Sequence, residues 1–384
     1  MCNNFRTTTM AQRIILAFDK FKGSLTSEQV AQAFARGWRM VVPDSDIATV
    51  PIADGGDGML HALSTTLGAT SQSLVAHDPL GRTITTHYAL SDSRAIIEMA
   101  QISGLALLNG EEHNPMLTSS YGLGEVMLDA LDRGARRMIL GIGGSATNDC
   151  GMGMLEALGY RFYDAQGKVL TSSGDAMCRV ARIDATNADT RLSECEIVVA
   201  SDVDNPLYGE RGAAWVYAPQ KGATKAMVEA LDEGMRCFSA TVDGDYHNLP
   251  GAGAAGGVGY ALMALLGATL KPGIELVLDT LNFDMLLDGA QLVVTGEGRI
   301  DSQTLMGKGP SGVLRRASIK GVPVVALGGR VEWCEELENS GFERIYEATH
   351  EGMALEEAMQ QKTAQQNICH AAMRIAREWL SLHS

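Results

Sequence analysis

Six short runs of apolar residues, each followed by a polar or glycine-rich loop, constrain the fold of this chain more than any other feature. The runs are RIILAF (13–18), IATVPI (47–52), RMILGI (137–142), EIVVAS (196–201), QLVVTG (291–296) and PVVALG (323–328). Continuous apolar runs of this length are typical of strands in parallel sheets that helices cover on both faces. The pattern predicts an α/β protein whose chemistry lies at the carboxyl ends of its strands.

The pattern changes in the stretch SQSLVAHDPLGRTITTHYAL. Here polar and apolar residues alternate on both sides of a turn at 78–81, as in an antiparallel hairpin. Units of one strand and one helix return after about residue 285. A chain of 384 residues is also longer than a domain with a single hydrophobic core usually is. We therefore expect two α/β domains. The first is a Rossmann-like domain with a parallel sheet, made of residues 12–78 and 285–384. Residues 79–284 form the inserted second domain, and the active site lies in the cleft between the two.

Composition narrows the class of ligand. The net charge of −15, from 31 basic and 46 acidic residues, argues against nucleic acid or an anionic membrane as the partner. The first ten residues lack the apolar core of a signal peptide, and no apolar run reaches the ~18 residues of a membrane span. Seven cysteines without a C-x-x-C pair fit a reducing compartment. We expect a cytoplasmic protein that acts on small molecules.

The stretch LGIGGSATNDCG permits two interpretations. Gly141, Gly143 and Ala146 fit the dinucleotide pattern G-x-G-x-x-[GA], and Asp164 follows at about the distance of a ribose-binding acid. That pattern requires a helix to begin inside the glycine loop, whereas here the polar triplet 147–149 intervenes. A polar triplet at a sheet edge is costly to bury and suits contact with a ligand. A nicotinamide-dependent dehydrogenase of hydroxy acids therefore stays an alternative.

The other loops supply charged groups without a standard signature. The G-x-x-x-x-G-K-[ST] loop, the H-R-D loop, H-E-x-x-H and G-x-S-x-G are all absent, and the eight histidines lack metal-ligand spacing. The polar loops are DKFKGS, ADGGDG, SDVDNP and TGEGRIDSQT, together with the glycine-rich LPGAGAAGGVGY and MGKGPSG. Carboxylates for Mg²⁺, cations for anionic groups and glycine-rich helix starts for phosphates are the needs of phosphoryl transfer.

Six blocks of this chain resemble, in order, the signature blocks of the class I glycerate kinase family. They are DKFKGSLTSEQVA, VPIADGGDG, GIGGSATND, SDVDNPL, PGAGAAGGVG and TGEGRIDSQTLMGKGP. The resemblance implies two α/β domains and phosphorylation of D-glycerate by MgATP, generally on the 2-hydroxyl, to give 2-phospho-D-glycerate and ADP. Two positions depart from the family pattern: Lys20 stands where serine is commoner, and Cys150 stands where the family usually has glycine, which raises the question of oxidation sensitivity.

Roles for single residues follow from their chemistry and from the loops that carry them. The predicted catalytic residues are Lys22, Asp54, Asp149 and Arg299, with Asp149, or in second place Asp54, as the base that deprotonates the attacking hydroxyl. Mg²⁺ is expected on Asp202, Glu297 and Asp301. The nucleotide is expected on Gly143, Gly144, Ser145, Asn148, Gly253, Gly256, Gly257 and Lys308. Glycerate is expected on Asp19, Lys22, Asp57, Arg299 and Gln303.

Three alternatives stay open beside a glycerate 2-kinase. The chain could phosphorylate the 3-hydroxyl, because the two products differ only by a shift of one carbon in the bound substrate. It could be the dehydrogenase discussed above. It could also be a non-catalytic solute-binding protein, since such proteins share a cleft between two α/β lobes. Assembly of the chain as a homodimer also stays open.

Overall fold

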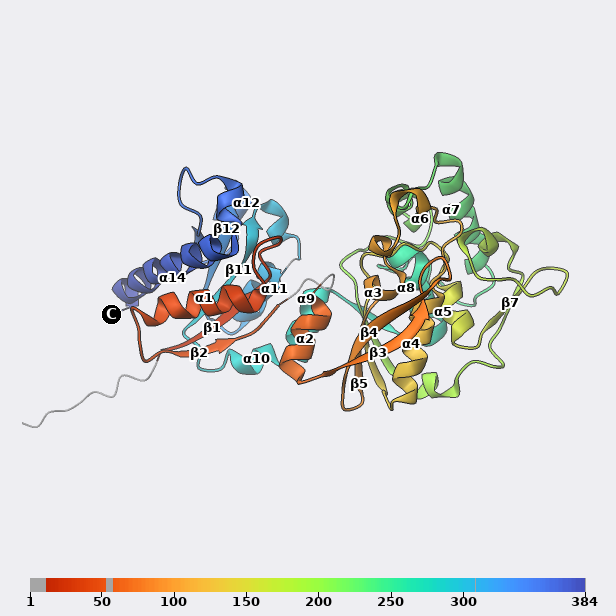
Figure 1. Cartoon of the computed structure of the whole chain (residues 1–384), viewed down its shortest axis with the longest axis horizontal. Coiled ribbons are helices and arrows are strands. Elements are labelled where there is room, and N and C mark those ends of the chain that lie inside the picture. Colours follow the sequence, from red (N-terminus) through yellow and green to blue (C-terminus); the bar gives the residue numbers. More distant parts are fainter. Residues whose placement is uncertain (1–11, 53–57, 308, 384) are drawn as a thin grey trace, which may run out of the picture. The chain divides into compact units, whose positions relative to one another are not determined.

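The computed structural model describes residues 12–52, 58–307 and 309–383, and the chain forms two compact units (Figure 1). The first unit combines the chain up to residue 53 with the part from Val277 onward, and the second unit comprises residues 54 to Leu276. Each unit contains its own sheet and its own apolar core. The fold class is therefore the expected one: a Rossmann-like α/β domain built from both chain ends, with a second α/β domain inserted.

The first unit has a five-stranded sheet in which all strands run parallel, in the order β13-β12-β11-β1-β2. Its strands are β1 (Arg13–Phe18), β2 (Asp46–Thr49), β11 (Leu292–Ile300), β12 (Val324–Val331) and β13 (Arg344–Glu347). Its helices are α1 (Ser27–Arg39), α10 (Phe283–Leu286), α11 (Gly309–Ile319), α12 (Glu335–Glu338), α13 (Leu355–Ala358) and α14 (Gln361–His383), with a 3₁₀ turn, η7 (Ser302–Leu305). Helix α9 (Gly273–Thr280) spans the limit between the units.

Helix α1 illustrates how the sequence builds this unit. Thr26 and Gln29 form a capping box, in which each side chain accepts a hydrogen bond from the other residue's backbone N–H. Phe34 and Trp38 lie on the buried stripe of the helix. A Cβ on Gly37 would lie 2.1 Å from the Cys369 carbonyl oxygen, so glycine lets α1 and α14 pack side by side (Figure 1).

The second unit has a six-stranded mixed sheet in the order β10-β9-β6-β5-β4-β3, parallel from β10 to β5 and antiparallel from β5 to β3. Its strands are β3 (Thr70–His77), β4 (Thr83–Ser91), β5 (Arg94–Glu98), β6 (Arg137–Gly141), β9 (Glu196–Ala200) and β10 (Thr269–Lys271), and β7 (Arg161–Tyr163) and β8 (Arg182–Asp184) form a separate antiparallel pair.

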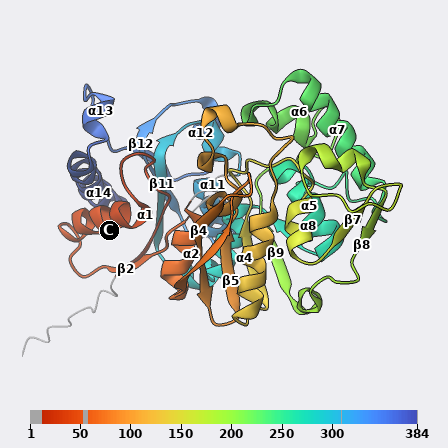
Figure 2. The same ribbon diagram turned by 45° about the vertical axis from the view of Figure 1, so that its right-hand side comes forward.

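Helices cover this sheet, and Figure 2 shows α4 along one of its faces. The helices are α2 (Met59–Leu67), α3 (Ala100–Ser103), α4 (Tyr121–Asp132), α5 (Met152–Ala157), α6 (Ala213–Tyr217), α7 (Lys225–Ser239) and α8 (Val258–Leu266). Short 3₁₀ turns are η1 (Leu105–Leu107), η2 (Gly110–Glu112), η3 (Gly174–Arg179), η4 (Thr190–Glu194), η5 (Pro219–Lys221) and η6 (Ala254–Gly257). Within the described ranges, no helix is long and apolar enough to cross a membrane.

The hairpin expected around 78–81 is present as β3 and β4. Both of its strands belong to the second unit, so the limit between the units lies earlier in the chain than expected. Thr70 to His77 pair with Leu90 to Thr83 along the whole of β3, so these residues belong to the sheet of the second unit. The expected limit after residue 78 therefore falls inside one hairpin. The second unit begins at residue 54, and it ends at 276 where 284 was expected.

Candidate active site

A cavity of about 430 Å³ opens at the carboxyl ends of strands β6 and β9 in the second unit. Gly141 and Ala200, the last residues of these strands, are register partners, so the loops that follow them start side by side. The cavity is lined by Leu105, Ile142, Gly143, Gly144, Ser145, Ala200, Ser201, Asp202, Val203, Tyr217, Gln220, Lys221, Ala254 and Ala255. Four of the predicted ligand-binding residues, Gly143, Gly144, Ser145 and Asp202, thus meet in one wall.

The loop after β6 is held by backbone hydrogen bonds to the segment that follows α3. The Leu105 N–H donates to the Gly144 carbonyl at 2.9 Å, and the Ala146 N–H donates to the Ser103 carbonyl at 2.9 Å. Gly144 has a φ of +70°, which glycine adopts without strain. The glycine-rich loop is therefore a fixed part of the cavity wall, with no side chain at 143 or 144 to keep a ligand from the backbone.

Lys221 is a cavity residue that the sequence patterns did not single out. It ends the 3₁₀ turn η5, is only 3% exposed, and its Nζ donates to Ser145 Oγ at 3.0 Å and to the Thr147 carbonyl at 2.7 Å. Burial lowers the pKa of this amine to about 7, against a smaller opposing effect of the Asp149 charge. The only local signal is a lysine inside the turn sequence APQKGA, which follows no strand.

Asp149, the predicted general base, is fully buried and does not line the cavity. Its carboxylate accepts four hydrogen bonds, from Ser120 N at 2.8 Å, Ser120 Oγ at 2.8 Å, Gly151 N at 3.1 Å and Gly153 N at 3.2 Å. Burial raises its pKa, and these donors partly oppose the shift. A general base must reach the proton that it removes. This geometry instead assigns Asp149 to joining the starts of α4 and α5.

The predicted phosphate-binding glycines of the segment 253–257 serve backbone packing. A Cβ on Gly253 would lie 2.4 Å from the Pro206 carbonyl oxygen, and one on Gly256 would lie 2.1 Å from the Thr147 carbonyl oxygen. Gly257, with a φ of +90°, packs against Cys150 in the same way. The segment lies against the loop after β6 and presents Ala254 and Ala255 to the cavity instead.

Asn148 and Cys150 lie in the same packed layer, and both are fully buried. Among the described residues, neither polar atom of the Asn148 amide has a hydrogen-bond partner, and Asn148 does not line the cavity. Burial raises the pKa of the Cys150 thiol well above its ordinary value. Since the thiolate is the reactive form, this environment disfavours the form of Cys150 that oxidants attack.

The first unit gathers the remaining described site residues at the carboxyl ends of β1 and β11. Phe18 pairs with Gly296, so Asp19 and Glu297 follow adjacent strand positions. Arg299, whose side chain is 60% exposed, donates from Nη2 to Glu332 and lies 3.4 Å, Nε to Oδ2, from Asp301. Asp301 in turn caps η7 by accepting a hydrogen bond from the backbone N–H of Gln303 at 2.9 Å. Lys22 and Gln303 are exposed.

A model of the glycerate kinase family matches residues 14–380 of this chain. The chain belongs to the glycerate kinase family. Membership makes it a kinase, and it extends the resemblance of six blocks to nearly the whole sequence.

Individual relatives agree with the family match. A protein of Halalkalibacterium halodurans named glycerate kinase is 44% identical, over 91% of this chain and 93% of its own length. A protein of Escherichia coli K12 named glycerate 2-kinase is 41% identical, over 95% of this chain and 97% of its own length. The crystal structure of a candidate glycerate kinase 2 from Salmonella typhimurium LT2 is similar with a TM-score of 0.88 and 40% identity, covering 97% of this chain and 99% of that one.

The dinucleotide interpretation of Gly141 to Ala146 fails on the structure of this family member. Helix α5 begins only at Met152, well after the glycine loop, so its N-terminus does not follow the pattern. Asp164 follows β7, a strand outside the main sheet, and its carboxylate accepts hydrogen bonds from the backbone N–H groups of Gln166 and Lys168. It therefore closes a local turn.

The predicted Mg²⁺ ligands are divided between the units. Asp202 belongs to the second unit, where its carboxylate accepts a hydrogen bond from Gly273 N at 2.8 Å, whereas Glu297 and Asp301 belong to the first. Within the described part of the chain, no three acidic, histidine or cysteine side chains form a group that could hold a metal. Asp54, Asp57 and Lys308, also predicted to act in the site, lie outside the described residues.

One or two carboxylates are nevertheless enough for Mg²⁺ at a phosphoryl-transfer site, because substrate phosphates complete its coordination. Asp202 is exposed and is the carboxylate that lines the cavity. The donor set therefore fits a magnesium ion that arrives together with phosphate oxygens.

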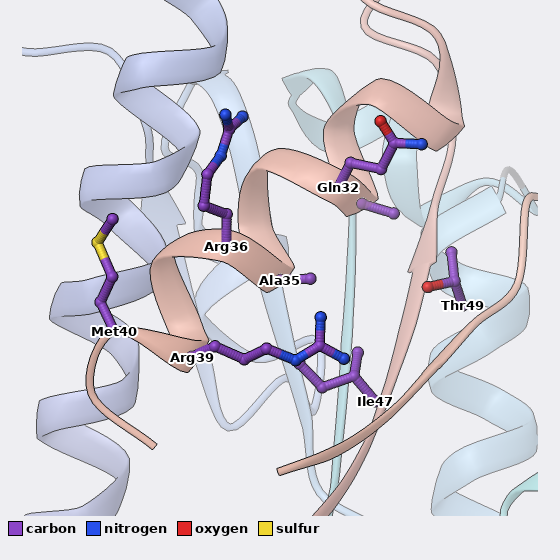
Figure 3. A pocket seen from close by; sticks show the side chains of 8 residues that line it. Gln32, Ala35, Arg36, Arg39, Met40, Ile47 and Thr49 are labelled. Carbon is purple, nitrogen blue, oxygen red and sulfur yellow. The ribbon is translucent and has the colours of Figure 1, made fainter. Parts of the chain in front are cut away.

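A larger hollow of about 560 Å³ lies in the first unit between α1 and β2 (Figure 3). Arg36 and Arg39 extend from α1, Met40 from the residue that follows this helix, and Ile47 and Thr49 from β2. Among the residues that the structure describes, none of the predicted site residues and no carboxylate lines this hollow. The cavity at β6 and β9 instead combines a glycine loop, a buried amine and a carboxylate, and such convergent polar groups mark a ligand site.

Proposed function

We propose that this protein uses ATP and Mg²⁺ to phosphorylate D-glycerate on its 2-hydroxyl, giving 2-phospho-D-glycerate and ADP. The observation that carries the proposal is the cavity in which the glycine loop after β6, the buried Lys221 and the exposed Asp202 converge. Family membership supports glycerate as substrate, and the name of the Escherichia coli relative supports the 2-position. The proposed setting is the cytoplasm, where ATP is available, with small molecules as the partners.

The nucleotide is proposed to occupy the cavity of the second unit. Its volume of about 430 Å³ lies in the range of sites for nucleotide-sized ligands, and Leu105, Ile142 and Val203 supply apolar walls for a base. Gly143 and Gly144 leave room for phosphates close to the backbone. When bound, Mg²⁺ would neutralise charge on the phosphate oxygens, with Asp202 as its protein ligand.

Glycerate is proposed to bind to the cationic and polar side chains of the first unit, Lys22, Arg299 and Gln303. The planar guanidinium of Arg299 can donate two parallel hydrogen bonds to a carboxylate. Its present partner, Glu332, is 55% exposed, and exchanging an exposed ion pair for a ligand costs little. Phosphoryl transfer depends mainly on positioning and charge neutralisation, so the proposal does not depend on Asp149 as a base.

The reaction can be tested on the purified full-length chain. ADP release is measured with ATP, Mg²⁺ and D-glycerate, and again with glycerate left out, and the product is identified by phosphorus NMR. We expect glycerate-dependent ADP and the signal of 2-phosphoglycerate. A 3-phosphoglycerate signal would move the transfer to the other hydroxyl, and the absence of glycerate-dependent ADP would overturn the proposal.

A further inference from the structure

We propose that Lys221 binds an anionic oxygen of a substrate inside the cavity of the second unit, either a phosphate oxygen of the nucleotide or the carboxylate of glycerate. The inference rests on the proposed function, and it adds to that function a binding residue contributed by the 3₁₀ turn η5.

Lys221 combines burial with access to the cavity, which is unusual for a lysine. The residue is 97% buried, yet it is part of the cavity wall. An ammonium group has three N–H donors, and two of them meet protein acceptors, Ser145 Oγ and the Thr147 carbonyl oxygen. Among the described residues the third donor has no acceptor. A ligand oxygen in the cavity would complete the set.

The charge of Lys221 has no countercharge beside it among the described residues. Both acceptors of Lys221 are neutral, and within the described residues no carboxylate lies at ion-pair distance from Nζ. A buried charge without a paired countercharge is costly, and buried lysines are rare unless they are paired. The position is explained if the countercharge arrives with the substrate.

The titratable groups that the structure describes near Lys221 do not supply a second positive charge that could bind an anion. Asp149 influences Lys221 electrostatically, but its carboxylate is already bound by four donors. Tyr217, on the cavity wall, donates to Asn205 Oδ1, and burial raises its pKa, so it is uncharged at neutral pH. Asp202 accepts a hydrogen bond from Gly273 N. Lys221 is thus the buried cation of this wall.

Binding of an anion should therefore be coupled to uptake of a proton. Burial lowers the pKa of Lys221 to about 7, so at pH 8 most of the amine is neutral before a ligand binds. An anionic oxygen next to Nζ favours the charged form and raises the pKa. At pH 8 we expect uptake of about one proton per bound ligand, and at pH 6 almost none, because the amine is then already protonated.

The experiment compares Lys221→Met with Lys225→Met, which removes an exposed lysine four residues further on, at the start of α7. Isothermal titration calorimetry with ATP and, separately, with D-glycerate is run at pH 8 in two buffers of different ionisation enthalpy. For the ligand that Lys221 contacts, we expect Lys221→Met to weaken binding about 10- to 100-fold, because hydrogen bonds to charged groups are strong, and to abolish proton uptake. Lys225→Met should match the wild type.

A second variant separates charge from structure. Lys221→Gln keeps N–H donors near Ser145 and Thr147 but cannot carry the charge, and melting temperatures verify that each variant folds. Weakened ATP binding would identify a phosphate as the partner, and weakened glycerate binding would identify the carboxylate.

If Lys221→Gln and Lys221→Met bind both ligands as the wild type does while glycerate-dependent ADP release continues, the inference is overturned and the proposed function stands. If the wild type itself binds neither ligand and releases no ADP, both fall.

Discussion

The two units present polar loops at the carboxyl ends of parallel strands, but they treat their charged groups in opposite ways. In the second unit, Lys221 is 3% exposed and Asp149 is fully buried, each within a network of backbone partners. In the first unit, Arg299 is 60% exposed and its partner Glu332 is 55% exposed. Buried groups are fixed and have shifted pKa values, whereas exposed groups keep the freedom to change partners.

This difference supports the proposed division of ligand binding between the two units. A rigid wall with fixed backbone and a preformed volume suits a large ligand whose shape does not vary, since little ordering is left to do on binding. Exposed side chains suit a small ligand that they can close around. Changes to the buried groups of the second unit should therefore act through stability or through ligand binding coupled to protonation, and a change at the exposed Arg299 of the first unit should act through the KM for glycerate.

The largest effect is expected where backbone packs on backbone in the second unit. Gly256 and Gly267 have almost the same φ, +67° and +66°, but a Cβ on Gly256 would lie 2.1 Å from the Thr147 carbonyl oxygen, whereas one on Gly267 would have nothing within 4 Å. Gly267→Ala should cost about 1 kcal/mol for the left-handed backbone alone. Gly256→Ala should cost about 4 kcal/mol because overpacking is added. Urea unfolding measures both, and equal losses would show that the layer is loosely packed.

The second prediction concerns Asp149. Asp149→Asn keeps the volume but replaces one acceptor oxygen by an NH₂ group that faces backbone N–H donors. We expect a loss of about 3 kcal/mol in the free energy of unfolding, with kcat per folded molecule reduced less than tenfold. A stable variant whose kcat falls by about 10²–10⁴ would instead restore Asp149 as the general base.

Much of this architecture could be predicted because it follows from local pattern. Each of the six apolar runs overlaps a strand of one of the two larger sheets, and parallel pairing of β6 with β9 brings Ser145 and Asp202 to one edge. What could not be predicted depends on distant partners. Lys221 is 76 residues from Ser145, and Asp149 is 29 residues from Ser120. No periodicity encodes such contacts, so the sequence does not indicate that Lys221 lines the cavity or that the Asp149 carboxylate is buried among four donors.

The third prediction uses protonation of Lys221 as a measure of its burial. Between pH 7 and about 10 the unfolded chain keeps a proton on this amine that the folded chain has lost, because the folded pKa is about 7. The unfolded state then binds more protons, so this residue makes stability rise with pH. Between pH 7 and 8.5 the wild type should gain about 1.6 kcal/mol relative to Lys221→Met, measured by urea unfolding at each pH. Parallel profiles would mean that the amine keeps its ordinary pKa.

The smallest change in stability is expected in the first unit, at Arg299. Arg299→Lys keeps the positive charge but loses the planar fork that can bind a carboxylate through two hydrogen bonds. If Arg299 binds glycerate, the KM for glycerate should rise about tenfold while the KM for ATP and the melting temperature stay unchanged. Arg137→Lys is the matched control, because Arg137 is also 60% exposed and paired with a glutamate, but it stands at the amino end of β6.

The control should leave both KM values as they are. If the two variants behave alike, Arg299 is an ordinary surface arginine and glycerate is bound elsewhere. A lower melting temperature in Arg299→Lys alone would show that the Glu332 pair supports the fold. That result would remove the contrast between the rigid cavity wall of the second unit and the adaptable side chains of the first. A glycerate KM that rises without loss of stability is the result that this contrast requires.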